Sequence, residues 1–270
     1  MGMILALEHC ERDLEKTIRL ARLLADLEPT YRTDLLLGLV CQPDTPYPRL
    51  VDETLEHCSH KFQVEHVVSA YGAPGWADGS GQLWRGTMSY FHNAWKRGKI
   101  NHNSIATFDG GDGVPLHNNW LNLLVTEHEI TRRAGKRVSG LLNLDVPEHA
   151  HINGNMVLDL ELWNLCPSIR DTPLGASPAE WYKCWDTYHA KTFMGNARPS
   201  TVVHNCWNHR GVTKQIMDEA ATSSVWLHGY KDEFLHDLAR ERLLVDLDGR
   251  STYPQMKSQV DLLKKILESP

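Results

Sequence analysis

The apolar run at residues 34–41, D-L-L-L-G-L-V-C, most constrains what this chain can fold into. It does not alternate with polar residues, which is typical of a strand buried on both faces of a parallel sheet. Another strand is predicted before it at residues 3–7, ending at Glu8, and helical spacing of apolar residues predicts a helix between the two. Residues 50–58 then predict a helix and residues 64–70 a third strand. This alternation favours an α/β layered domain with right-handed crossovers.

Later residues continue the alternation of strands and helices. The predicted elements are strands at residues 104–108, 137–144 and 224–227, and helices at residues 120–133, 177–189 and 256–267. Asn118 or Asn119 is expected to cap the first of these helices. We expect residues 1–232 to form the α/β domain and residues 233–270 to form a helical extension that packs on it.

Composition limits the classes of protein to consider. The chain has 270 residues, enough for one large domain, and a formal net charge of -6, so it does not indicate broad nonspecific binding to nucleic acid. Its six cysteines form no C-x-x-C pair and its beginning is not typical of a secretory signal, so we expect reduced thiols in a cytoplasmic protein. No apolar run is long enough to predict a membrane span.

Two carboxylates follow the predicted strand at residues 104–108. Asp109 and Asp112 are separated only by Gly110 and Gly111. Paired glycines permit a sharp turn, which is expected to bring both carboxylates toward one point. Two close acidic groups repel each other unless a proton or a cation lies between them, and a divalent cation prefers oxygen ligands. The alternative is a polar turn in which Asp and Gly serve only turn chemistry.

A glycine-rich stretch at residues 71–82 predicts a long ligand-binding loop. It has neither the spacing of a dinucleotide fingerprint nor that of a phosphate loop. The aromatic stripe that follows, from Trp84 to Trp95, is interpreted as core packing. His204, Cys206 and His209 are expected to lie in a polar loop, because their spacing fits no closed zinc site. The whole chain has nine tryptophans and 15 histidines, which is many for its length and suits a polar, aromatic-lined cleft.

Three short motifs occur in the order found in glycosyltransferases of the GT-A class. F-D-G-G-D-G-V-P-L-H-N-N-W, residues 108–120, resembles the acidic metal motif of several such families, with its Val-Pro-Leu and downstream Trp. H-I-N-G-N-M-V-L, residues 151–158, is similar to a segment that shapes their sugar and acceptor pocket. W-L-H-G-Y-K-D, residues 226–232, resembles their late His-Gly-x-Lys-Asp element. The resemblance covers residues 3–232 and implies a Rossmann-like mixed sheet flanked by helices in a single domain.

The resemblance also implies a metal-dependent use of a nucleotide-sugar donor. The usual metal motif is Asp-x-Asp; Asp112 matches its last acid, and Gly110 falls where the first is expected. The candidate metal ligands, for Mn²⁺ or Mg²⁺, are Asp109, Asp112 and His228. A UDP-sugar is the first expectation for the donor. The candidate donor-binding residues are Glu8, Asp109, Lys231, Trp76 and Gly79.

The acceptor side is less defined by the sequence. Asp186, on the predicted helix at residues 177–189, is the candidate catalytic base, with Glu180 and Asp171 as rivals. The expected acceptor is a hydroxyl of a glycan, a small molecule or a hydroxymethylated base in DNA. The last is a phage-type reaction that would take place in the host cytoplasm and require base flipping. The tryptophans considered for stacking on such a base are Trp76, Trp84, Trp181 and Trp207.

Two other kinds of function stay open from the sequence. A sugar-binding module without turnover explains the Trp and Asn content equally well. A metal-dependent hydrolase is the other alternative, and its ligands would be His149, His151, His204 and His209.

Overall fold

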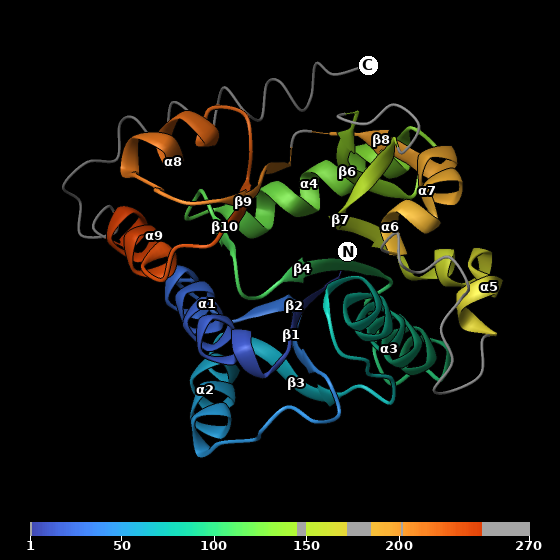
Figure 1. Ribbon diagram of the computed structural model, residues 1–270, viewed down its shortest axis with the longest axis horizontal. Coiled ribbons are helices and arrows are strands. Elements are labelled where there is room, and N and C mark those ends of the chain that lie inside the picture. Colours follow the sequence, from blue (N-terminus) through green and yellow to red (C-terminus); the bar gives the residue numbers. More distant parts are fainter. Residues whose placement is uncertain (1, 145–149, 172–184, 201, 245–270) are drawn as a thin grey trace.

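The computed structural model describes residues 2–144, 150–171, 185–200 and 202–244, without the side chains of residues 76, 77, 168, 169, 207 and 208. Strands and helices alternate through the first part of the chain, as predicted (Figure 1). The elements are β1 (Met3–His9), α1 (Leu14–Leu27), β2 (Arg32–Cys41), α2 (Arg49–Ser59), β3 (Phe62–Val68), α3 (Trp76–Lys96) and β4 (Ser104–Asp109).

The later part contains more strands than the sequence predicts. Its elements are β5 (Gly113–Pro115), α4 (Trp120–Arg133), β6 (Val138–Asn143), β7 (His151–Asp159), α5 (Pro167–Arg170), α6 (Trp185–Tyr188), α7 (Ala190–Asn196), β8 (Ala197–Pro199), β9 (Val203–His209), α8 (Lys214–Ala221), β10 (Trp226–Tyr230) and α9 (Leu235–Leu244). Short 3-10 helices lie at Glu11–Asp13 and Leu160–Leu165. The predicted helices at residues 177–189 and 256–267 fall largely or wholly outside the described residues.

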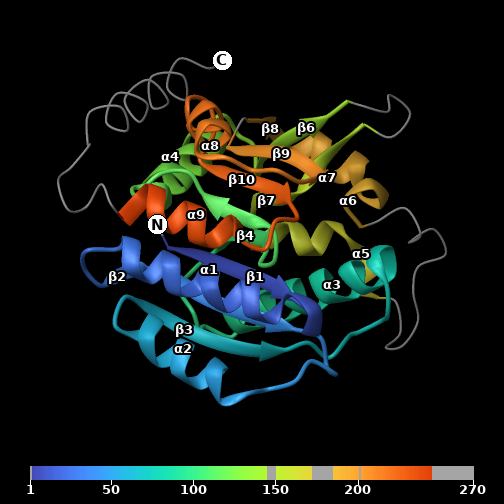
Figure 2. The ribbon, with the colours of Figure 1, turned by 60° about the vertical axis from the view of Figure 1, so that its left-hand side comes forward.

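The strands form two sheets. The seven-stranded sheet has the order β3-β2-β1-β4-β7-β6-β8, and a three-stranded sheet has the order β5-β10-β9. β3, β2, β1 and β4 run parallel, while β7 is antiparallel to both β4 and β6, so the large sheet is mixed. In Figure 2 the smaller sheet lies beside α8 and α9. The carboxyl ends of β1 to β4 therefore share one edge, and the smaller sheet follows directly from the end of β4.

The central strands are buried on both faces, which confirms the interpretation of the apolar run. In β1, the side chains of Met3, Leu5 and Leu7 join the core that contains α1, whereas Ile4 and Ala6 join the core that contains α3. Helices α1 and α2 cover one face of this part of the sheet and α3 covers the other (Figure 1). Burial on two faces keeps charged side chains out of the middle of β1, β2 and β4, so their carboxylates lie toward the strand ends.

The glycine-rich stretch is a shorter loop than the sequence predicts. Helix α3 begins at Trp76 and takes in residues 76–82. Glycine lowers helix propensity, but tertiary contacts override this preference here. A Cβ at Gly86 would lie 1.9 Å from the Ser69 hydroxyl, so the helix depends on glycine for its close approach to the chain after β3. The predicted core stripe is confirmed, since Trp84, Met88 and Phe91 are fully buried in α3.

Strands β5, β7 and β9 were not predicted as strands. β7 contains Gly154 and three polar residues at its start, which lower its strand propensity, yet it pairs with β4 and β6. The polar loop expected around His204, Cys206 and His209 is wrong, because these residues form β9, parallel to β10. These segments form strands because they pair with strands elsewhere in the fold. The local pattern of polar and apolar residues does not show such pairing.

Candidate metal centre

Two sheets meet at the carboxyl end of β4, where Asp109 is the last residue of the strand. Asp112 comes just before β5, which pairs antiparallel with β10 so that Gly113 lies opposite His228. The backbone N–H of Gly229 also donates a hydrogen bond to the carbonyl of Asp112 (2.9 Å). Strand pairing thus places an acidic loop beside a histidine that lies more than a hundred residues later.

Asp109, Asp112 and His228 come together as the sequence predicts. One ligand atom from each lies within 4.8 Å of the others, and no other such group of three His, Cys, Asp or Glu residues is found in the described residues. Asp112 and His228 are buried, whereas Asp109 is exposed. The centre therefore has a buried floor and one side open to a ligand.

The two glycines between the acids have a different role from the one expected. Neither has a positive φ, so the turn itself does not require glycine. Glycine is required here because α1 leaves no room for a side chain: a Cβ at Gly110 would lie 2.3 Å from the Thr17 hydroxyl oxygen. A Cβ at Gly111 would lie 3.0 Å from the Asp13 side chain. The glycines let the loop pass close to α1 and hold the carboxylates at the sheet edge.

Charge balances the buried carboxylate in this structure. The Lys231 ammonium makes an ion pair with Asp112 Oδ2, and His228 Nε2 lies 3.8 Å from Asp112 Oδ1. Burial lowers the pKa of His228, opposed by the charges of Asp109 and Asp186, so the imidazole is neutral and has one nitrogen free to bind a cation. The buried Asp112 carboxylate already pairs with the Lys231 ammonium, so its surroundings favour a positively charged ligand.

The donor set suits Mn²⁺ or Mg²⁺. Carboxylate oxygens favour Mg²⁺ and Mn²⁺, and one imidazole is accepted readily by Mn²⁺. Asp109, Asp112 and His228 are the residues that would hold the ion. The histidine hydrolase alternative has no support among the described residues, since His151, His204 and His209 join no metal group there. His149 lies outside the described residues.

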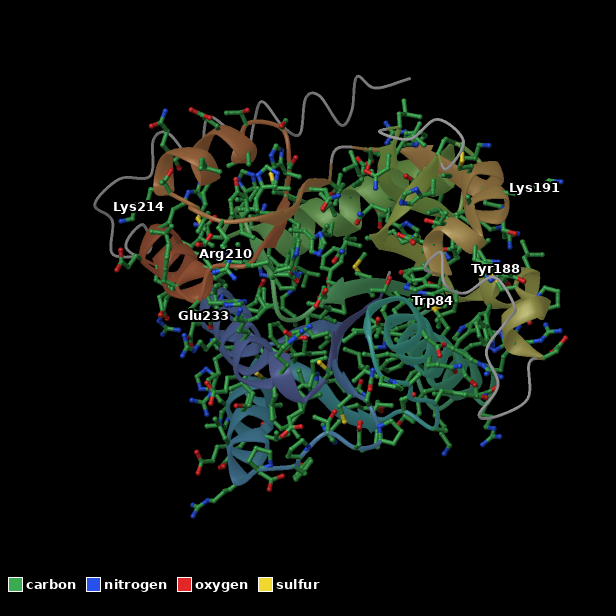
Figure 3. All side chains as sticks on the ribbon, in the orientation of Figure 1. Trp84, Tyr188, Lys191, Arg210, Lys214 and Glu233 are labelled. Carbon is green, nitrogen blue, oxygen red and sulfur yellow. The ribbon has the colours of Figure 1, made fainter. Side chains whose placement is uncertain are left out.

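Two asparagines to which the sequence analysis gives no role contact the residues of this centre. Asn155 Oδ1 accepts a hydrogen bond from the backbone N–H of Asp109 (3.0 Å), and Asn205 Oδ1 lies 2.9 Å from His228 Nδ1. The Asp232 carboxylate accepts hydrogen bonds from the backbone N–H groups of residues 211 and 212 (3.1 and 3.0 Å), which ties the loop after β10 to the loop after β9. Arg210 and Glu233, from these two loops, lie on the same side of the molecule in Figure 3.

Glu8 lies next to the metal group, at the end of β1 and opposite Asp109 in the strand register. Burial raises the pKa of Glu8 to about 8; a hydrogen bond with Thr87 opposes the shift and the charge of Asp109 adds to it. The carboxyl group is therefore mostly protonated at neutral pH and can donate a hydrogen bond. Neutral Glu8 is thus compatible with the nearby anionic Asp109.

A cavity of about 510 Å³ lies beyond the ends of β2 and β3, on the same edge of the sheet as Asp109. It is lined by Gln42, Pro43, Asp44, Ala70, Tyr71, Gly72, Ala73, Pro74 and Gln82. Gly79 is beside it, since its carbonyl accepts a hydrogen bond from Gln42 (3.4 Å) and its Cβ position faces the Ala73 carbonyl. Trp76 begins α3, but its side chain is outside the described part of the chain.

Asp186 lies in α6 and contacts the start of β7. Its Oδ2 accepts a hydrogen bond from the Gly154 backbone N–H (2.9 Å) and lies 3.7 Å from His151 Nε2, while Oδ1 accepts from the Thr187 N–H (2.8 Å). The carbonyl of Gly154 also accepts a hydrogen bond from Thr107 Oγ1 of β4 (3.1 Å), so Asp186 lies two strand positions from Asp109 through this chain of contacts. Of its rivals, Asp171 is exposed and paired with Arg170, and residue 180 lies outside the described residues.

Trp84 is not available to stack on a flipped base. It is fully buried, and its ring stacks on Trp185 with the ring centroids 4.1 Å apart. The predicted stacking role of Trp84 is therefore wrong, because the ring fills the core between α3 and α6. Trp181 and the side chains of Trp76 and Trp207 fall outside the described part.

The architecture is that of GT-A glycosyltransferases: a mixed seven-stranded sheet flanked by helices, with the acidic loop at the end of a central strand. The structure of galactosyltransferase LgtC with donor and acceptor sugar analogs is similar to this chain at 11% identity, with a TM-score of 0.51, covering 97% of this chain and 100% of that one. An active-site mutant of LgtC is similar at 10% identity and a TM-score of 0.50, covering 85% of this chain and 87% of that one.

Comparisons of the sequence find no match that would identify a family. No family model matches the chain, and no curated protein matches its sequence. At these levels of identity the structural likeness shows the fold alone. Among the described helices, none combines the length and the apolar content needed to cross a membrane.

Proposed function

We propose that this protein is a divalent-metal-dependent glycosyltransferase that uses a nucleotide-sugar donor. The observation that carries the proposal is the convergence of Asp109, Asp112 and His228, whose ligand atoms lie within 4.8 Å of one another at the end of a central strand. The GT-A fold supports it, because the group lies at the edge where open α/β sheets bind ligands.

The proposed chemistry is transfer of a sugar from a nucleoside diphosphate to a hydroxyl group. When bound, a divalent cation supplies positive charge for the leaving diphosphate, whose negative charge grows as the sugar bond breaks. Asp109, Asp112 and His228 are the residues that would hold this cation. Lys231, whose side chain is 39% exposed, lies beside Asp112 and can direct its ammonium group to a phosphate oxygen.

The donor is proposed to lie along the edge formed by β1 to β4. The cavity beyond β2 and β3 is the proposed place for the nucleoside, with the diphosphate at the metal group and Glu8 between them. A protonated Glu8 can donate a hydrogen bond to a carbonyl oxygen or to the ribose. Gly79 lets α3 lie close to Ala73 and Gln42, which line this cavity. A UDP-sugar is the first donor to test.

The acceptor is proposed to approach from the side of β7. Asp186 is the proposed base that takes the proton of the acceptor hydroxyl, because its carboxylate is bonded to Gly154 of β7, which contacts Thr107 of β4 just before Asp109. Two backbone N–H groups hold its carboxylate, which favours a fixed orientation. The acceptors to test are small sugars, glycans and DNA with hydroxymethylated bases.

Calorimetric titration with UDP, in the presence and absence of Mn²⁺, tests the proposal. We expect UDP to bind much more tightly with Mn²⁺, and we expect Asp112→Ala to abolish this difference while Asp237→Ala, an exposed control on α9, preserves it. UDP binding that is independent of Mn²⁺ and unaffected by Asp112→Ala would refute the proposed metal role. No binding in either condition would reject UDP as the nucleotide.

Turnover separates the enzyme from a sugar-binding module. We expect slow Mn²⁺-dependent hydrolysis of UDP-sugars, which is lost in Asp112→Ala and retained in Asp237→Ala. Transfer of labelled sugar to one of the acceptor classes would then identify the acceptor. Donor binding with neither hydrolysis nor transfer, over all nucleotide sugars and acceptors tested, would favour the binding module instead.

A further inference from the structure

We propose that Asn205 is a positioning residue that holds His228 in the one imidazole tautomer able to bind a cation. This inference rests on the proposed function, because it concerns the affinity of the same metal centre. It assigns a purpose to an amide side chain of β9 that belongs to none of the three sequence motifs.

Strand pairing places Asn205 directly beside the histidine. β9 and β10 run parallel, and Asn205 lies opposite His228 in their register. Asn205 Oδ1 is 2.9 Å from His228 Nδ1, a normal hydrogen-bond distance. Because strands rather than loops carry both residues, their relative position is fixed by the backbone of the smaller sheet.

This contact determines which ring nitrogen carries the proton. An amide oxygen can only accept a hydrogen bond, so His228 Nδ1 is the donor and Nε2 has the free lone pair. Nε2 is the nitrogen on the side of the carboxylates, 3.8 Å from Asp112 Oδ1. That distance is too long for a hydrogen bond, so both atoms remain available to a cation.

Loss of Asn205 would remove this control. His228 is only 5% exposed, so an Nδ1–H group without Asn205 would be buried without a partner. The ring could then place its proton on Nε2, where it blocks binding to a cation. Partners of metal-binding histidines act in this way generally, and their loss weakens metal affinity by about 10- to 100-fold.

Titration with Mn²⁺ alone, followed by the electron paramagnetic resonance signal of the free ion, tests the proposal without any substrate. We expect Asn205→Ala to weaken Mn²⁺ binding by about 10- to 100-fold. Asn205→Asp should restore affinity to within about threefold of the wild type, because a carboxylate also accepts from Nδ1–H. Cys206→Ala, the next residue of the same strand, is the matched control and should bind Mn²⁺ as the wild type does.

Nitrogen-15 NMR of the histidine rings gives a second measurement that needs no variant. The wild-type protein should show His228 protonated at Nδ1 and not at Nε2. A proton on Nε2 would overturn the proposal, as would wild-type Mn²⁺ affinity in a folded Asn205→Ala protein or equal weakness of the Ala and Asp variants. Wild-type protein that binds no Mn²⁺ would overturn the proposed metal centre itself, which is a distinct outcome.

Discussion

Replacing Gly110 with alanine should disturb the metal centre through a steric clash rather than through the backbone conformation. The new Cβ would lie 2.3 Å from Thr17 Oγ1 and 2.8 Å from Thr17 Cγ2. Ordinary contacts between carbon atoms begin at about 3.5 Å, so either the loop or α1 must move by about 1 Å. Neither moves freely, since the Gly110 N–H is bonded to the Glu8 carbonyl (3.0 Å) and Thr17 is fully buried with its hydroxyl bonded to Asp13 (3.0 Å).

The size of the effect follows from this confinement. Overpacking of this kind costs about 1–3 kcal/mol of the free energy of unfolding. Functional groups need to be held within about 0.5 Å of their working positions, so a shift of Asp109 by about 1 Å should also weaken Mn²⁺ binding about tenfold or more. Gly110→Ala therefore combines a moderate loss of stability with a clear loss of metal affinity.

Urea unfolding and Mn²⁺ titration measure the two effects. Adding Thr17→Ala removes the two closest atoms and leaves Thr17 Cβ, at 3.0 Å, as the next nearest, so the double variant should recover at least half of both losses. Gly195→Ala is the control, because nothing lies within 4 Å of its Cβ position in α7 and we expect a change within about 0.5 kcal/mol. The reasoning is refuted if Gly110→Ala matches the wild type in both assays, or if Thr17→Ala gives no recovery.

Three further predictions concern stability and the loop after β10. Burial lowers the pKa of His117 from 6.5 to about 4, so the unfolded chain binds this proton first and stability falls as the pH drops from 6.5 to 4. His117→Gln should reduce the slope of unfolding free energy in that window by about 1.4 kcal/mol per pH unit in urea titrations, and an unchanged slope would contradict the assignment. Asp232→Ala frees the loop that carries Lys231 and should weaken UDP binding about tenfold in calorimetry while Mn²⁺ affinity stays the same; a matching loss of Mn²⁺ affinity would argue against this separation of roles. Trp185→Ala removes the ring stacked on Trp84 and should cost about 3–5 kcal/mol in urea unfolding, whereas a cost below about 1 kcal/mol would show that the stack is not part of the core.

The local sequence predicted the first half of the fold well. Central parallel strands are buried on both faces, so they leave continuous apolar runs, and helices between them leave an apolar stripe at helical spacing. These patterns located β1, α1, β2 and α2 correctly, and predicted β3 two residues late. The acidic pair was also visible, because a carboxylate directly after an apolar strand must lie at the edge of the sheet.

Local pattern failed where a segment takes its structure from a distant partner. The glycines of α3 predicted a loop, but they permit close packing against the chain after β3. Strand β7 has polar residues and Gly154 in its first half, and it lies in the sheet because β4 and β6 flank it. Strand β9 is also absent from the predicted elements, because its own residues do not indicate that it pairs with β10.

The sequence alone thus determined that the chain alternates strand and helix, and that Asp109 and Asp112 follow a buried strand. Only the tertiary structure decided that β5 pairs with β10, which places His228 beside Asp112, and that β9 supplies Asn205 to the same ring. The reason is physical. Hydrophobic burial and helix periodicity act over a few residues and appear in the sequence, whereas the position of a distant ligand depends on sheet pairing between segments such as β5 and β10, which are more than a hundred residues apart.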